Sequence, residues 1–237
     1  MLGAHLGERA AHFMRTGERP GEEVLGERDT VAGLFGTMLE GMFGPFFERQ
    51  ILPDLPVYRE IDASQGLAVD LGCGNGWYLR RLARGYPNLR GVGLDLFDEA
   101  IAEARSRASA EGTSDRLDFR KGDMHQFTVD EPAGLIAMNR ALHHVWDQKE
   151  QVFAFLCDHL GSGGAAVIWE PNWPGDRHAL TDPGRRGMAF QNLLEHVQGN
   201  HFLQAEEIAA EFEKVGMRPE VHLYGEGNEA VVVGRKP

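Results

Sequence analysis

The chain contains little cysteine and no long apolar run. The only cysteines among the 237 residues are Cys73 and Cys157. Two cysteines supply neither a disulfide framework nor the ligand set of a zinc site. The missing apolar run argues against a membrane span. The charged and glycine-rich N-terminal residues argue against a signal peptide, so we expect a cytoplasmic protein without membrane contact.

Positive charge is also scarce. The chain has 24 Lys and Arg against 36 Asp and Glu, a formal net charge of −12, and a pI near 5.3. Nucleic-acid binding depends largely on cationic side chains that displace counterions from phosphates. The composition therefore favours a small-molecule partner over a nucleic acid, in one large domain or a core with an accessory segment.

Alternating apolar strands and amphipathic helices occupy the chain from residue 66 onward. The expected strands are 66–71, 91–96, 117–121, 134–138 and 165–169, and the expected helices are 77–84, 98–108, 149–160 and 205–215. Such alternation predicts an α/β fold with a doubly wound, mostly parallel sheet and a ligand at the carboxyl ends of its strands. Two further strands, 221–224 and 230–233, follow each other so closely that they must form an antiparallel hairpin.

The N-terminal region differs from this core. Residues 1–30 have apolar residues too scattered for a strong helical face, whereas 31–52 repeat them at helical spacing, interrupted by Gly44 and Pro45. We predict two short helices there, whose apolar stripe of Phe35, Met38, Met42, Phe43 and Phe46 forms a lid. The expected division is a helical lid at 1–55 and a core at 56–237, with a second lid segment at 171–204.

Three glycines at every second position follow the first expected strand, at Gly72, Gly74 and Gly76. Glycine permits a tight turn and lets a ligand approach main-chain N–H groups. A dinucleotide fold requires the spacing G-x-G-x-x-G/A, and the third position of that pattern is Trp77 here. This departure counts against NAD.

Acidic residues end the next two strands. Asp95 lies 19 residues after Gly76, where a carboxylate would accept hydrogen bonds from both hydroxyls of an unphosphorylated ribose. Asp123 and Met124 end the third strand and offer an acceptor for an adenine amine and a soft side chain for a purine face. Together, these residues favour an adenosine-containing cofactor.

The chain resembles the class I S-adenosylmethionine-dependent methyltransferases, specifically their small-molecule branch. The resemblance covers about residues 66–164 and rests on five segments in order: VDLGCGNG at 69–76, GVGLD at 91–95, GDM at 122–124, LHHV at 142–145 and LGSGG at 160–164. The last segment departs from the family's usual hydrophobic-Pro-Gly-Gly turn but keeps the turn glycines.

The resemblance implies a seventh, antiparallel strand within the C-terminal hairpin and S-adenosylmethionine as cofactor. By this resemblance, the cofactor would be bound by Asp70, Gly72, Cys73, Gly74, Gly76 and Asn139 at its methionine end, by Asp95 at its ribose, and by Leu96, Asp123 and Met124 at its adenine.

The acceptor side offers weaker signals, because methyl transfer from a sulfonium needs mainly alignment and exclusion of water. The candidate catalytic residues are His143, His144 and Glu170. Adjacent residues of an α-helix point about 100° apart, so at most one histidine is expected to face the pocket, and a structural role for the pair is the alternative. Glu170 would orient the acceptor or cap a helix.

Three residues are candidates for acceptor binding: Arg140, Trp173 and His178. Arg140 would pair with a substrate carboxylate or form an exposed salt bridge. His196 and His201 are five positions apart, about 140° around a helix, which spoils a shared ligand face unless the chain breaks at Gly199. We therefore expect no metal.

The sequence thus predicts an S-adenosylmethionine-dependent methyltransferase, a transferase with a small-molecule acceptor, placed in secondary metabolism. The alternatives are a partner or regulatory protein that binds the cofactor without catalysis and, ranked lower, an NAD-dependent oxidoreductase. A homodimer is one arrangement open to it. The acceptor and the methylated atom are left open.

Overall fold

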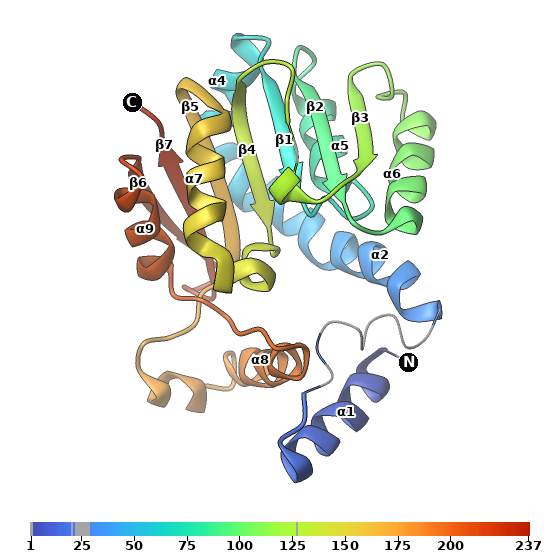
Figure 1. The fold of residues 1–237 in the computed structure, drawn as a ribbon, viewed down its shortest axis with the longest axis vertical. Helices are drawn as coiled ribbons and strands as arrows, with labels where there is room; N and C mark the ends of the chain where they lie inside the picture. The colour runs from blue at the N-terminus through green and yellow to red at the C-terminus, as the bar shows by residue number, and fades with distance from the viewer. Residues whose placement is uncertain (1, 20, 22–28, 127) are drawn as a thin grey trace.

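The computed structural model describes residues 2–19, 21, 29–126 and 128–237 (Figure 1). A single sheet lies at the centre, with helices on both of its faces and a further group of helices beyond one edge of the strands. None of the helices in this described part is long and apolar enough to cross a membrane.

The sheet has seven strands in the order β3-β2-β1-β4-β5-β7-β6. Their bounds are β1 Leu67–Leu71, β2 Arg90–Asp95, β3 Leu117–Lys121, β4 Ala133–Asn139, β5 Leu160–Pro171, β6 Arg218–Tyr224 and β7 Glu229–Arg235. Strands β1 to β5 pair in parallel, and β7 is antiparallel to both β5 and β6. The predicted doubly wound sheet and its antiparallel hairpin strand are confirmed.

Two apolar cores cover the two faces of the sheet. On one face lie α4 Val57–Ala63, α5 Trp77–Gly85 and α6 Asp98–Ala110, and on the other lie α7 Lys149–His159 and α9 Ala205–Lys214. Neighbouring residues of β4 separate accordingly, because Leu135 packs into the first core and Ile136 into the second. This alternation is the period-two pattern of a strand buried on both faces.

The N-terminal helices depart from the sequence prediction in two ways. Helix α1, Leu2–Thr16, lies in the region whose apolar residues looked too scattered; Leu6 and Ala10 pack with Val197 of α8, Arg186–Gln198. Helix α2, Asp29–Phe46, runs through Pro45 instead of breaking there, and continues as the π-helical segment η2, Phe47–Ile51. Pro45 cannot donate the hydrogen bond that an interior helical residue makes to the carbonyl oxygen four residues earlier, so α2 continues with one backbone bond missing.

Strand β5 is longer than predicted. It begins at Leu160 rather than Ala165, and its pairing with β4 shifts register between Ala133 and Leu135. The intervening glycines form an irregular stretch of strand in place of a simple turn. The shift leaves the carboxyl ends of β4 and β5 level, with Asn139 opposite Trp169.

The carboxyl ends of the parallel strands meet at the edge where α2, α8 and α1 lie (Figure 1). The remaining short helical segments are α3 Leu52–Asp54, η3 Met124–Gln126, η4 Leu142–Gln148 and η5 Arg177–Thr181. In a sheet whose strand order reverses between β1 and β4, this edge is where ligands bind.

Candidate functional site

The glycine loop between β1 and α5 is fixed to the neighbouring strand. The N–H groups of Gly72 and Cys73 both donate to the carbonyl oxygen of Leu94, at 2.9 and 2.8 Å. Gly76 has φ +73°, and a Cβ on it would lie 2.5 Å from the ring of Phe119. Glycine is therefore required at this start of α5 both by backbone conformation and by space.

Gly74 differs from its neighbours because the space above it is open. It has φ +51°, and a Cβ built on it meets no heavy atom within 4 Å. Its N–H donates to Asp95 Oδ2 at 2.8 Å. The top of the loop thus presents bare backbone toward the carboxyl edge of the sheet, as close approach of a ligand requires.

Asp95 is half-buried and holds two loops together. Oδ2 accepts the N–H of Gly74 and Oδ1 accepts the N–H of Phe97, at 2.8 and 3.1 Å. Burial raises the pKa of Asp95, and the backbone N–H groups counter that shift. A carboxylate has about four acceptor positions, so Asp95 can accept a further donor.

Asp70 and Asn139 meet at the ends of β1 and β4. Asn139 Nδ2 donates to Asp70 Oδ1 at 3.1 Å. Burial raises the pKa of Asp70 to about 8, an effect that the Asn139 hydrogen bond opposes and the charge of Asp95 strengthens. Asn139 Oδ1 is buried and has no hydrogen-bond partner within the described ranges. An unpartnered acceptor beside a desolvated carboxyl is an arrangement suited to a cationic donor.

The predicted adenine residues lie on the adjoining loops. The Gly122 N–H donates to the Asp95 carbonyl oxygen at 3.0 Å, which ties the loop after β3 to the loop after β2. Asp123 is half-buried and caps His125 N through Oδ1, at 2.9 Å. Met124 packs partly against the sheet core, whereas Leu96 is 59% exposed. An apolar side chain left exposed at this edge is available to a flat ring.

Helix α2 covers part of the glycine loop. A Cβ on Gly36 would lie 3.1 Å from Asn75 Cβ, so the helix and the loop are in close contact. Glu40 accepts hydrogen bonds from Asn75 Nδ2, Arg80 and Arg107, at 3.1, 2.9 and 2.9 Å. This carboxylate joins α2 to the loop, α5 and α6.

The expected apolar stripe of α2 divides into two parts. Phe43 and Phe46 pack against the buried Trp169, at ring centroid distances of 5.7 and 5.9 Å. Met38 and Met42 are exposed, while the side chain of Phe35 lies outside the described residues. The lid role stays a prediction.

The candidate catalytic residues come together at the carboxyl ends of β4 and β5. Glu170 is fully buried; its Oε2 lies 2.7 Å from His143 Nδ1, and its Oε1 accepts the N–H of Leu142 at 2.8 Å. Glu170 therefore caps η4, which was one of its two expected roles. The carboxylate outweighs burial and raises the pKa of His143 to about 10.

The two histidine rings lie side by side, contrary to the expectation that they would diverge. Their centroids are 4.2 Å apart. The two residues lie in η4, a 3-10 segment with non-helical φ of −119° at Val145, so the α-helical geometry behind the expectation does not apply. Both rings consequently belong to one cluster.

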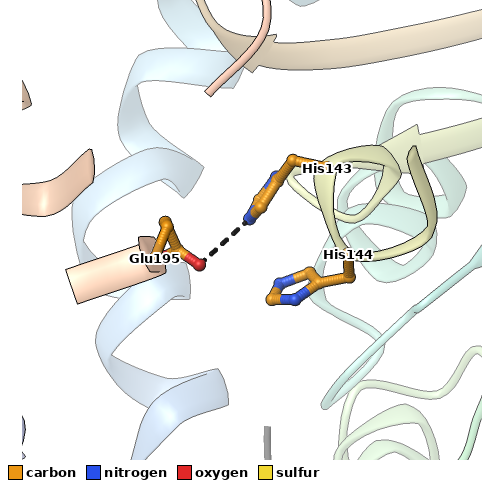
Figure 2. Close-up of side chains that lie close together, drawn as sticks. All are labelled: His143, His144 and Glu195. Atoms are coloured by element: carbon orange, nitrogen blue, oxygen red, sulfur yellow. Dashed lines mark ion pairs between the residues drawn. The ribbon is translucent and has the colours of Figure 1, made fainter. Parts of the chain in front are cut away.

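Sequence reasoning did not identify Glu195 or Asn200 as part of this cluster. Glu195, on α8, places Oε2 3.6 Å from His143 Nε2, and Asn200 Nδ2 lies 2.8 Å from His144 Nδ1. Figure 2 shows Glu195 approaching both histidines from the opposite side. His143, His144 and Glu195 are hereafter called the His-His-Glu cluster; each offers a ligand atom, and these atoms lie within 4.8 Å of one another.

His196 and His201 flank the end of α8 and do not join this cluster through the contacts described. The helix ends at Gln198, followed by Gly199 with φ +97°, and the two rings stack at a centroid distance of 6.3 Å. The chain therefore breaks at the glycine, which was the condition left open for these histidines. Burial is the main cause that lowers the pKa of His196.

Arg140 is held by protein groups. It has φ +56°, pairs with Glu229 Oε2 at 2.6 Å, and places its guanidinium carbon 3.9 Å from the centroid of the Phe43 ring. Trp169 Nε1 donates to the same carboxylate oxygen at 2.7 Å. The expected alternative of a salt bridge within the protein fits these contacts, but the pair is largely buried and not exposed as expected.

The other two candidates for acceptor binding lie on the segment after β5. Trp173 is half-buried, and its N–H donates to the carbonyl oxygen of Leu203 at 2.9 Å. His178 is exposed on η5, where its N–H donates to Asp176. Their roles stay predictions.

The central part of the chain matches a family model described as a methyltransferase domain, over residues 68–164. A trans-aconitate 2-methyltransferase of Rhizobium rhizogenes is 34% identical over 52% of this chain and 44% of its own length. A sterol 24-C-methyltransferase of Saccharomyces cerevisiae is 29% identical over 53% of this chain and 32% of its own length. The chain thus spans less than half the length of these curated relatives.

Solved structures share the fold over nearly the whole chain. An O-methyltransferase family protein of Burkholderia thailandensis superposes with a TM-score of 0.79 at 18% identity, over 98% of this chain and 68% of that one. An O-methyltransferase from neocarzinostatin biosynthesis, solved with S-adenosylmethionine and 2-hydroxy-5-methyl naphthoic acid, gives a TM-score of 0.70 at 20% identity, over 99% and 69%.

Proposed function

We propose that this chain, whose residues 68–164 match a methyltransferase domain, acts as a class I S-adenosylmethionine-dependent methyltransferase and transfers the cofactor's methyl group to an oxygen of a small-molecule acceptor. The family's cofactor is S-adenosylmethionine, which supplies a methyl group already activated on a sulfonium. The chain's own residues then have three tasks: to hold the cofactor, to align the acceptor and to keep water out.

The cofactor residues fit the chemistry of that molecule. Asp70 and the unpartnered Oδ1 of Asn139 form a pair of acceptors for the ammonium of the methionine end. Asp95 retains acceptor capacity for the ribose hydroxyls beyond the N–H groups of Gly74 and Phe97. The open backbone at Gly74 lets the ligand approach the loop. The unpartnered acceptor beside Asp70 is the observation that carries the cofactor assignment.

The His-His-Glu cluster supports an oxygen acceptor. It lies after β4 and at α8, on the carboxyl edge that also holds Asp70 and Asn139. A hydroxyl must lose its proton to attack a methyl group, and the His144 imidazole and the Glu195 carboxylate are groups that can assist that loss. His143 does not take this role near neutral pH, because its raised pKa keeps it protonated. Glu170 is fully buried and acts through His143, so it is a positioning residue.

The names of similar proteins also support methyl transfer to a small molecule, although they differ on which atom receives the methyl group. The solved neighbours cited above are called O-methyltransferases, and one was solved with a hydroxynaphthoic acid. The yeast relative is called a C-methyltransferase. We propose a hydroxylated small molecule as acceptor, and the neighbour from neocarzinostatin biosynthesis supports a role in secondary metabolism.

Calorimetry tests the cofactor part. S-adenosylmethionine and its demethylated product should both bind the purified chain at one site. If neither ligand binds, the proposed function is excluded. Exposed Asp118 offers a control on β3, because Asp118→Ala should leave the affinity unchanged.

Product analysis tests the acceptor part. The chain is incubated with methyl-labelled cofactor and a panel of hydroxylated aromatic acids, and the labelled products are examined by mass spectrometry and NMR. A label on oxygen is the expected result. A label on carbon or nitrogen would contradict the oxygen assignment. Cofactor binding with no turnover of any acceptor until another protein chain is added would favour the regulatory alternative.

A further inference from the structure

The geometry points to a divalent metal site formed by the His-His-Glu cluster. We propose that His143 Nε2, His144 and the Glu195 carboxylate bind one ion between them (Figure 2). The two histidines come from η4 and the carboxylate from α8, so the ion would join two segments that are about 50 positions apart in the chain. This proposal revises the expectation that the site needs no metal.

The separation of His143 and Glu195 carries the first part of the argument. His143 Nε2 and Glu195 Oε2 are 3.6 Å apart, which is too long for a hydrogen bond. Two ligand atoms that each lie about 2.1 Å from a tetrahedral ion are about 3.4 Å apart. The side chains are therefore spaced as two ligands of one ion, whereas a directly bonded imidazolium and carboxylate would be closer.

The hydrogen-bond partners of the two histidine rings also support a metal site. Histidines that bind metals commonly donate their other ring N–H to a carboxylate or amide oxygen, which orients the ring. His143 Nδ1 has such a partner in Glu170 Oε2 at 2.7 Å. That partner is fully buried and is itself fixed by the N–H of Leu142.

His144 has a comparable partner in Asn200. The side-chain amide of Asn200 lies 2.8 Å from His144 Nδ1. The nitrogen and oxygen of an amide exchange places by a half rotation with little change in position. With the oxygen toward Nδ1, Asn200 accepts the Nδ1 proton, and the His144 Nε2 lone pair becomes the ligand.

Charge and burial favour a cation at this place. Glu170 and Glu195 approach His143 from its two ring nitrogens, with side-chain exposures of 0% and 17%, and the His143 side chain is 4% exposed. Poorly hydrated carboxylates gain strongly from a nearby cation. A divalent ion would complete the balance that a single histidine provides only in part.

The donor set indicates the class of ion. Two imidazoles and one carboxylate suit zinc, iron(II), cobalt(II) or manganese(II) better than calcium or magnesium, which prefer oxygen ligands. Three protein ligands leave at least one coordination position open, as in catalytic sites. That the open position receives an acceptor oxygen rests on the proposed function; the binding of the ion does not.

The test measures metal binding by the full chain, prepared without a histidine tag and without cofactor or acceptor. Zinc is titrated by calorimetry, and cobalt(II) is followed by its visible ligand-field absorption. The variants are Glu195→Gln, which removes a ligand charge, and Glu206→Gln on α9 as the matched control. We expect one ion per chain, binding at least tenfold weaker in Glu195→Gln, and wild-type affinity in Glu206→Gln.

Glu170→Gln distinguishes an oriented site from chance binding at exposed histidines. Removal of an outer partner of a metal ligand typically weakens binding about 10- to 100-fold, and the same change is expected here. Melting curves and calorimetry with S-adenosylmethionine establish that each variant is folded. His144→Gln replaces Glu195→Gln if the latter does not fold.

Two results would overturn the proposal. One is a wild-type chain that binds no zinc or cobalt(II); the other is an affinity and a cobalt spectrum that remain unchanged in both Glu195→Gln and His144→Gln. Because the measurement omits the cofactor, a chain that binds the ion but not S-adenosylmethionine would contradict the proposed function alone.

Discussion

The cofactor half and the acceptor half of the site are formed by different kinds of chemical groups. The cofactor half consists of a backbone loop, Gly72 to Gly76, and of polar residues such as Asp95 that directly follow predicted strands and are therefore marked by their position in the sequence. The acceptor half consists of side chains from β5, η4 and α8, joined by the contacts of Glu170, His143 and Glu195. A site made of local backbone turns is visible in a sequence, whereas one made of distant side chains requires the fold.

The contrast predicts that the acceptor half loses most when one buried side chain is removed. Glu170→Ala leaves His143 without its carboxylate and the Leu142 N–H without an acceptor, both in a dry interior. Breaking a buried ion pair by removing one partner typically costs about 3–5 kcal/mol. Urea denaturation should show a decrease in the free energy of unfolding of that order.

An exposed ion pair is the control for this effect. Glu131 pairs with Arg90 at 2.6 Å, with both side chains about half exposed. Glu131→Ala should produce no measurable change, because solvent screens such pairs. Equal effects of the two substitutions would show that the Glu170 contacts do not hold η4 in place.

The cofactor half should lose affinity rather than stability when its acid is removed. In Asp95→Ala, the ribose loses two acceptors and the Gly74 N–H loses its partner. A hydrogen bond to a charged group is worth about 1.5–3 kcal/mol, so binding of S-adenosylmethionine should weaken roughly 100-fold. Calorimetry of the folded variant measures this, and an affinity within threefold of wild type would remove Asp95 from the ribose site.

The cofactor half was more predictable from the sequence than the acceptor half. The sheet, the hairpin and the positions of the acids after β2 and β3 were predictable, because apolar periodicity and glycine spacing are local signals. The paired rings of His143 and His144 were not, because the sequence predicted α-helical geometry where the chain forms the 3-10 segment η4. Glu195 was missed because its partner lies 52 positions earlier in the chain.

Errors at the N-terminus have a related cause. The path of α2 through Pro45 depends on the packing of Phe46 and Phe47 against Trp169, far along the chain on β5. Helix α1 likewise depends on α8 for the burial of Leu6. In both cases tertiary packing outweighed the local propensity.

The protonation of Asp70 gives the cofactor half a pH dependence of its own. Burial raises its pKa to about 8, above the value near 3.9 of an unfolded chain, so the folded state binds more protons between these values. The free energy of unfolding should therefore decrease as pH rises through this window. Between pH 6.5 and 8 the decrease should be about 1.5 kcal/mol.

Asp70→Asn removes this titration while keeping the shape of the side chain. The difference between the wild-type and variant stability curves, measured by denaturation at each pH, isolates the contribution of Asp70 from those of other groups. A difference that does not change with pH would show that Asp70 is already ionised in the folded cofactor half.

The smallest expected effect separates the backbone's two roles, folding and ligand approach. Gly74 and Gly112 both have positive φ, +51° and +69°, and a Cβ on either meets no atom within 4 Å. Alanine at either position should cost about 1–2 kcal/mol of stability through backbone strain. Only Gly74→Ala places a methyl group over the glycine loop, so only this variant should bind S-adenosylmethionine about tenfold more weakly by calorimetry. Equal cofactor affinity in the two alanine variants would mean that the ligand does not approach the loop at Gly74, and that the cofactor half depends on side chains as the acceptor half does.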